Sequence, residues 1–155
     1  MAAPTLFFED LQVGQVDRFG AYRVTRDEVI EIASRFDPQP FHIDEEAAAA
    51  NPIFGGLSAS AIHTLAMTSR MQADRATVTG FRPHAGLGMQ DMQTLHPVYP
   101  GDTLSVAVEI TELRVSRSRP DCGIVTSAIT TLNQQGTAVM RFRAVFLFKR
   151  RPQDP

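Results

Sequence analysis

The stretch GGLSASAIHTLAM, residues 55–67, decides the fold. Its side chains are small or apolar on every face of a helix, so we expect a long helix over about 56–72 that is buried all round. Small side chains let neighbouring backbone approach closely, as when a sheet wraps around a helix. We assign the same purpose, close backbone approach at a helix start, to Gly55 and Gly56.

Beyond about residue 84 the sequence alternates between apolar and polar residues. This period of two predicts antiparallel strands with one face on the core. One strand covers 104–111. The turn sequence at 133–136 lies between two further strands, which form a hairpin. We expect the Pro-Gly-Asp turn at 100–102 to join a strand over about 86–96 to the strand from 103. The predicted core-facing side chains are Leu104, Val106, Val108 and Ile110, then Met140, Phe142, Ala144, Phe146 and Phe148.

Two helices are predicted before the long one. Thr25 and Glu28 have the spacing of a capping box, which predicts a helix over about 26–36. A second, short helix begins at Asp44 and stops at Asn51. Helices are thus grouped early and antiparallel strands late, which favours an α+β fold over a parallel α/β sheet.

Composition narrows the functional class. Lys and Arg total 15 against 17 Asp and Glu, a formal charge of −2 that argues against binding nucleic acid or an anionic membrane. No window approaches the roughly 20 apolar residues of a membrane span. Cys122 is the only cysteine, so no intrachain disulfide forms, and a packed side chain is favoured over a nucleophile. We expect one soluble, cytoplasmic domain over residues 1–155.

Common metal and nucleotide motifs are missing from the sequence. None of the four histidines pairs with another at a metal-ligand spacing, and a lone cysteine does not make a thiolate zinc site. Neither a dinucleotide-binding nor a nucleotide-phosphate glycine motif is present. We therefore expect no metal.

A proline-restricted segment, DPQPFH at residues 37–42, carries the candidate chemistry. Its prolines restrict the backbone and therefore the positions that Asp37 and His42 can take relative to each other. Such a pair can position and deprotonate a water near neutral pH. The alternative is structural: a turn or cap role for Asp37 and a backbone-bonded His42. Free N–H groups from Gly56 through Ala61, at the start of the long helix, are suited to stabilise negative charge on a substrate carbonyl.

Asp37, Gln39, Pro40 and His42 together resemble the hydratase motif of MaoC-like dehydratases, the hot-dog-fold group that contains (R)-specific enoyl-CoA hydratases. The segments FFEDLQVGQ and YPGDTL, at 7–15 and 99–104, are similar to two further markers of that family in the same order. The resemblance implies one hot-dog domain, an antiparallel sheet wrapped around a long central helix. It also implies a homodimer or an assembly of dimers.

By that resemblance, Asp37 and His42 activate the water that is added to an enoyl-CoA thioester or removed from a 3-hydroxyacyl-CoA. The backbone amide near Ala61 polarises the thioester carbonyl. Coenzyme A belongs to the substrate, so no resident cofactor is implied. The further substrate contacts are Ser60, Gly56 and Ser69 along the long helix, with Arg114, Arg117 and Arg119 as candidates for coenzyme A.

Two departures from the family pattern keep other interpretations open. Gln39 stands where the family has Asn, and Ser60-Ala61 stands where a His-Gly pair is usual. Besides a hydro-lyase, we consider a hot-dog thioesterase and a non-catalytic acyl-CoA-binding subunit. For His63, a bond to a neighbouring group is favoured over contact with substrate.

Overall fold

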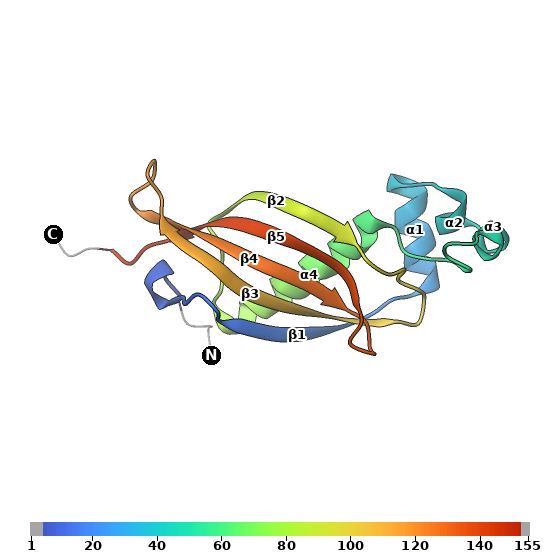
Figure 1. The fold of residues 1–155 in the computed structure, drawn as a ribbon, viewed down its shortest axis with the longest axis horizontal. Coiled ribbons are helices and arrows are strands. Elements are labelled where there is room, and N and C mark those ends of the chain that lie inside the picture. Colours follow the sequence, from blue (N-terminus) through green and yellow to red (C-terminus); the bar gives the residue numbers. More distant parts are fainter. Residues whose placement is uncertain (1–4, 153–155) are drawn as a thin grey trace.

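The computed structural model describes residues 5–152. One antiparallel sheet of five strands, in the order β1-β3-β4-β5-β2, curves around a single long helix, α4 (Figure 1). Three shorter helices gather beyond one end of the sheet. This is the predicted hot-dog arrangement, and the fold class is α+β. The elements are η1 (Phe8–Asp10), β1 (Val16–Arg23), α1 (Arg26–Phe36), α2 (Pro40–Ile43), α3 (Glu45–Ala50), α4 (Ala61–Thr79), β2 (Ala85–Thr94), β3 (Thr103–Val115), β4 (Cys122–Leu132) and β5 (Ala138–Lys149).

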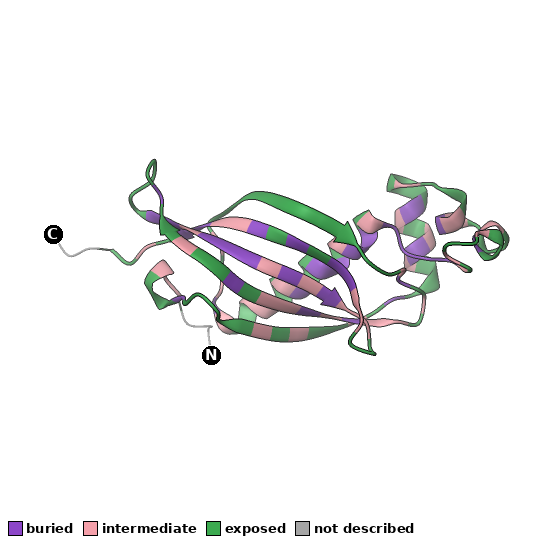
Figure 2. Cartoon of the chain, in the orientation of Figure 1, coloured by how far each residue is buried: buried purple, intermediate pink, exposed green. Residues whose placement is uncertain are grey.

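The alternation predicted for the later strands is confirmed. Burial alternates along β3 and β5, and the central strand β4 is the most buried (Figure 2). The hairpin of β4 and β5 is in register, with Ile129 opposite Phe142. The inner face of the sheet therefore supplies one side of the core, and α4 supplies the other.

Helix α4 is amphipathic rather than buried all round, which corrects the expectation for residues 56–72. It runs from Ala61 to Thr79, and Ile62 on its outer side is 50% exposed. The small residues before it are buried but extended, and the Ala59 N–H donates to a carbonyl of the segment after β2 (2.8 Å). Ser60 then caps the helix. The buried stripe of α4 consists of His63, Thr64, Met67, Thr68 and Met71, three or four residues apart.

Two of the three early helices were predicted. Helix α1 has its predicted bounds, and Thr25 accepts a hydrogen bond from the Glu28 N–H (3.4 Å). Asp44 caps α3, as predicted, by accepting from the N–H groups of Glu46 and Ala47. Helix α2 was not predicted, because its four residues begin with the second of two prolines in a segment that has the pattern of a rigid loop.

The grouping of strands after helices is incomplete, because β1 precedes α1. This edge strand pairs only with β3 and has an irregular register after Phe19. Its sequence, VDRFGAYR, does not alternate between apolar and polar residues, so the pattern did not predict it. The turn at 100–102 does connect β2 to β3 along the chain, but the two strands are not neighbours in the sheet. Gly101, with a φ of +98°, instead donates its N–H to the Val24 carbonyl after β1 (2.8 Å). A left-handed φ of this size favours glycine.

Strand β2 is left uncovered. It pairs with β5 on one edge, and all ten of its residues are exposed. Leu87, Met89 and Met92 are 53%, 55% and 49% exposed. Long apolar edge strands are unusual in a monomer because they offer free backbone pairing groups.

A buried polar contact ties α4 to the middle of the sheet. The hydroxyl groups of Thr68 and Thr131 lie 2.7 Å apart, and Thr68 also donates to the Thr64 carbonyl (2.8 Å). Thr131 is therefore the donor to Thr68. Both threonines are fully buried.

We expect Thr68→Val to lower the free energy of unfolding by about 1–3 kcal/mol, because it leaves the buried Thr131 hydroxyl without a partner. Urea unfolding measures this loss. Replacing both residues with valine removes both polar groups, so the double variant should be more stable than Thr68→Val. A double variant that is as unstable as the sum of the two single variants would contradict the contact.

Candidate functional site

Local chain geometry places Asp37 and His42 on two sides of a tight bend. Asp37 ends α1, and its N–H donates to the Ala33 carbonyl (2.8 Å). The Gln39 N–H then donates to the Asp37 carbonyl (2.8 Å), and Pro40 starts α2. Proline suits this position because its fixed φ matches a helix and its missing N–H is not needed there.

His42 is buried, and its tautomer is set by the backbone. Its Nδ1 lies 2.6 Å from the Ser58 carbonyl oxygen. A carbonyl only accepts, so Nδ1 carries the hydrogen, and neutral His42 presents a lone pair at Nε2. This Nε2 lies 3.8 Å from Asp37 Oδ2. That separation is too long for a direct hydrogen bond, but one water beside the pair, about 2.8 Å from each atom, can bond to both.

Asp37 and His42 line a cavity of about 350 Å³. One wall comes from the bend between α1 and α2, another from the first turn of α4, and a third from the segment that follows β2. Tyr99 donates its hydroxyl hydrogen to the Phe54 carbonyl (2.6 Å), which fixes the loop over the cavity. The cavity is lined by Asp37, His42, Ile53, Phe54, Ala59, Ala61, Thr64, Thr94, Leu95, His96, Pro97, Val98 and Val139.

The N-terminus of α4 supplies hydrogen-bond donors to this cavity. The Ser60 hydroxyl accepts from the His63 N–H (3.2 Å), and the Ser60 carbonyl accepts from Thr64. Within residues 5–152, the N–H groups of Ala61 and Ile62 have no partner. Because Ala61 lines the cavity, its amide stands where negative charge on a bound carbonyl oxygen can be stabilised.

Three helix residues expected at the site are not on the cavity wall. Ser60 is fully buried and is used as the helix cap. Gly56 lies four residues before that cap, so it is not part of the helix start. A Cβ at Gly56 would meet nothing within 4 Å, so close approach does not explain it. Ser69 lies two turns along α4 and is exposed.

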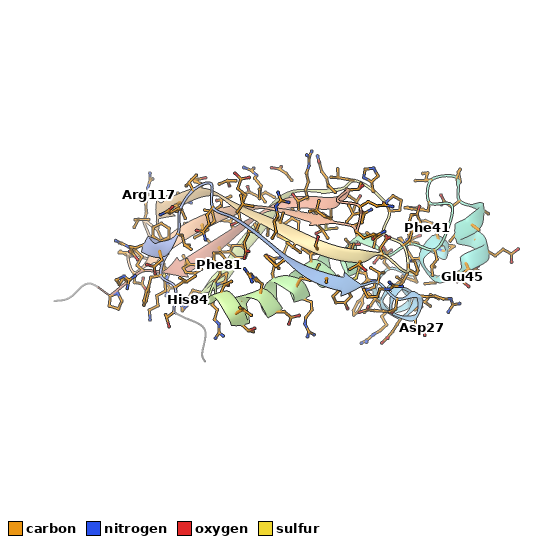
Figure 3. All side chains as sticks on the ribbon, turned by 90° about the horizontal axis from the view of Figure 1, so that it is seen from below. Asp27, Phe41, Glu45, Phe81, His84 and Arg117 are labelled. Atoms are coloured by element: carbon orange, nitrogen blue, oxygen red, sulfur yellow. The ribbon has the colours of Figure 1, made fainter. Side chains whose placement is uncertain are left out.

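The arginines expected to bind coenzyme A lie at the end of the sheet that is far from the cavity. Arg114 is near the end of β3, and Arg117 and Arg119 are in the following loop, opposite the short helices (Figure 1; Arg117 and Phe41 in Figure 3). Strand β3 is 13 residues long, which corresponds to about 40 Å. These arginines therefore do not reach the cavity of their own chain.

His63 lies behind the cavity wall in a separate buried cluster. It is 1% exposed, and neither ring nitrogen has a hydrogen-bond partner in the part of the chain that the structure describes. Its Nε2 is 3.7 Å from Glu28 Oε1, which accepts a hydrogen bond from the Tyr22 hydroxyl (2.6 Å). The expected bond to a neighbouring group is therefore not formed among the described residues, and His63 does not line the cavity. Burial lowers the pKa of His63, and the bond to Glu28 raises the pKa of Tyr22 to about 12.

Other reactive groups and cavities lie away from the Asp37–His42 pair. Cys122 is buried, and burial raises the pKa of its thiol, so it is a packed side chain. A second cavity, of about 100 Å³, lies between α4 and the sheet beside the ion pair of Arg75 and Asp17 (2.8 Å). Among residues 5–152, no three His, Cys, Asp or Glu side chains lie together as metal ligands. No helix in that range is long and apolar enough to cross a membrane.

Sequence reasoning missed His96, Tyr99 and Phe54 as parts of the site. Only the fold brings His96 and Phe54 to the wall of the cavity, and Tyr99 contacts that wall through its bond to Phe54. The available signal for His96 was its place between a predicted strand and the Pro-Gly-Asp turn. Restricted segments at strand ends commonly carry functional side chains.

An antiparallel sheet of five strands around one long helix defines a hot-dog fold, and an Asp–His pair lies beside the N-terminus of that helix. A model of the MaoC like domain matches residues 10–133, and the chain belongs to this family.

Relatives span nearly the whole chain. The uncharacterized protein YdeM of Bacillus subtilis is 33% identical over 142 residues, which cover 92% of this chain and 98% of YdeM. The MaoC-like dehydratase from Rhodospirillum rubrum is 40% identical, with a TM-score of 0.84 over 96% of this chain and 99% of its own. An (R)-hydratase from A. caviae, involved in PHA biosynthesis, is 26% identical, with a TM-score of 0.70 over 93% and 99%.

The buried His63 gives a prediction for stability against pH. Its folded pKa lies below its ordinary value of 6.5, so the unfolded chain binds the proton more readily. The contribution of neutral His63 is complete above pH 6.5 and is lost as pH falls below 6.5 towards the folded value. We expect urea unfolding from pH 7.5 to 5 to show a steeper loss of stability in the wild type than in His63→Gln. Equal slopes would show that His63 is not held neutral.

Proposed function

We propose that this protein is a hydro-lyase that adds water to an enoyl-CoA thioester, or removes it from the corresponding (R)-3-hydroxyacyl-CoA. The observation that carries the proposal is the His42 bond to the Ser58 carbonyl. It leaves the lone pair of Nε2 3.8 Å from Asp37 Oδ2, so that one water beside the pair can bond to both atoms. Membership of the MaoC-like family and similarity to an (R)-hydratase support the same reaction.

Each group at the site has a defined task in this reaction. Asp37 accepts a hydrogen bond from one O–H of the water, which stays on the oxygen, and His42 Nε2 takes the other hydrogen as a proton while the water oxygen bonds to C3. The electrons of the C2–C3 double bond move onto the thioester oxygen, where the Ala61 N–H stabilises the enolate. His42 then returns its proton to C2. Dehydration follows the same steps in reverse, and coenzyme A enters only as part of the substrate.

Neither departure from the family pattern removes a group that this reaction needs. The Gln39 side chain is exposed, and the bend is held by its backbone N–H and carbonyl. Ala61 has an N–H just as glycine does. These points favour catalysis over a non-catalytic acyl-CoA-binding subunit.

We further propose that two copies of the chain associate through β2. The strand is ten residues long, fully exposed and apolar at Leu87, Met89 and Met92, and its one charge, Asp91, is paired with Arg143 of its own chain (2.7 Å). An antiparallel strand edge is complementary to itself under twofold symmetry. Pairing of two such edges extends the sheet and covers the exposed side chains.

Asp37→Asn and His42→Ala should each lower turnover of trans-2-enoyl-CoA thioesters at least about 100-fold, because each removes one of the two groups that activate water. Loss of the enoyl absorbance measures turnover, and circular dichroism checks the fold. The control is Asp27→Asn, whose carboxylate is 93% exposed on α1. Full activity in either site variant would contradict these roles. Release of free thiol without loss of conjugation would indicate a thioesterase.

Met89→Lys should convert the dimer to a monomer, because it places a charge in the proposed strand pair. Sedimentation velocity measures the mass, with Val13→Lys as the control, since Val13 is 60% exposed but lies outside the sheet. A wild-type monomer, or a Met89→Lys dimer, would exclude association through β2.

A further inference from the structure

His96 is the third titratable side chain on the wall of the Asp37–His42 cavity. It comes from a different part of the fold, two residues after the end of β2. The mechanism above does not use it. Its position on the wall means that a ligand filling the cavity meets His96 as well as the catalytic pair.

The orientation of His96 is fixed by the end of the sheet. Its Nδ1 lies 3.0 Å from the Ala138 carbonyl oxygen at the start of β5. On either side, Leu95 donates its N–H to the Val139 carbonyl (2.8 Å), and Pro97 restricts the backbone. The imidazole is therefore held by the rigid sheet rather than by a free loop.

The same bond decides which nitrogen of His96 is free. Because the Ala138 carbonyl only accepts, Nδ1 carries the hydrogen, and the neutral ring has a lone pair at Nε2. Within residues 5–152, Nε2 has no hydrogen-bond partner and no carboxylate lies within 4 Å of the ring. His42 is fixed in the same way but has Asp37 nearby. Without a carboxylate partner, His96 is an acceptor for binding rather than a second water-activating group.

The rest of the wall offers few groups of this kind. Most lining residues are apolar, and the Thr64 hydroxyl already donates to the Ser60 carbonyl (3.1 Å). His96 is exposed to solvent, so its free Nε2 is hydrated until a ligand covers it. A ligand that covers Nε2 without supplying a donor is disfavoured, because it removes water from the acceptor and gives no bond in return.

We propose that His96 is a substrate-binding residue that selects acyl thioesters carrying an N–H or O–H donor, which it binds through Nε2. The class of ligand, acyl thioesters, is taken from the proposed function, on which this inference therefore rests. Two parts of such a substrate carry a donor: the amide groups of the pantetheine arm, and a hydroxyl on the acyl chain.

The test measures binding separately from turnover. Calorimetry gives Kd values for wild type, His96→Leu and His96→Gln with two ligands, butyryl-CoA and 3-hydroxybutyryl-CoA. The measurements with 3-hydroxybutyryl-CoA use the Asp37→Asn background, so that the ligand does not react. Loss of one hydrogen bond should raise Kd about three- to tenfold in His96→Leu. His96→Gln is the matched control, since its amide oxygen is again an acceptor, and its Kd should lie closer to wild type.

Comparison of ligands identifies the donor. If the effect of His96→Leu is the same for both CoA ligands and disappears with the ethyl thioester of butyric acid, which has no pantetheine amide, the donor is in the pantetheine arm. If the effect appears only with the 3-hydroxyacyl ligand, the donor is the acyl hydroxyl. Either pattern supports the proposal.

Equal Kd values for wild type and His96→Leu with both CoA ligands would overturn it. So would an equal loss with every ligand, including the ethyl thioester, because that loss would not depend on a donor. Failure of the proposed function is a separate result: the wild type would bind acyl-CoA as described and hydrate none of the enoyl-CoA panel.

Discussion

The structure depends on one packing constraint: a five-stranded sheet has one apolar face, and a single helix of 19 residues covers it. A helix of that length extends about 28 Å, with a diameter of about 10 Å. It therefore covers β1, β3 and the middle of the sheet, while β2 at the far edge has no cover (Figure 1). The buried Thr68–Thr131 contact fixes the helix on the central strand.

This constraint also determines where the chemistry lies. Because α4 runs along the length of the sheet, its N-terminus lies at the end of the sheet where α1 is joined to α2 (Figure 1). The cavity forms where four element ends meet: the ends of α1 and β2, the short helix α2, and the start of α4. Backbone carbonyls at this junction orient both imidazoles, His42 through Ser58 and His96 through Ala138. Groups fixed in this way need little reorganisation when a substrate binds.

Sequence patterns predicted the elements whose stability is local or whose faces are clearly divided. Capping at Thr25 and Asp44 located α1 and α3, and strict alternation located β3 and β5. The sequence patterns gave wrong predictions where tertiary contacts overrode the local preference of the residues. The small residues 57–60 suit a buried helix but are extended, since Ser60 caps α4. Edge strand β1 has no fully buried residue, and its apolar and polar residues do not alternate.

The sequence by itself determined that Asp37 and His42 lie together, because only four residues separate them and two of these are prolines with restricted backbone angles. It also determined the α+β class, through a change of period from helical to alternating. Only the tertiary structure decided that His96 joins the pair, that Ser69 is exposed, and that Arg114, Arg117 and Arg119 lie at the opposite end. These distances depend on how α4 crosses the sheet and on the strand order, which arise from packing between segments far apart in the chain.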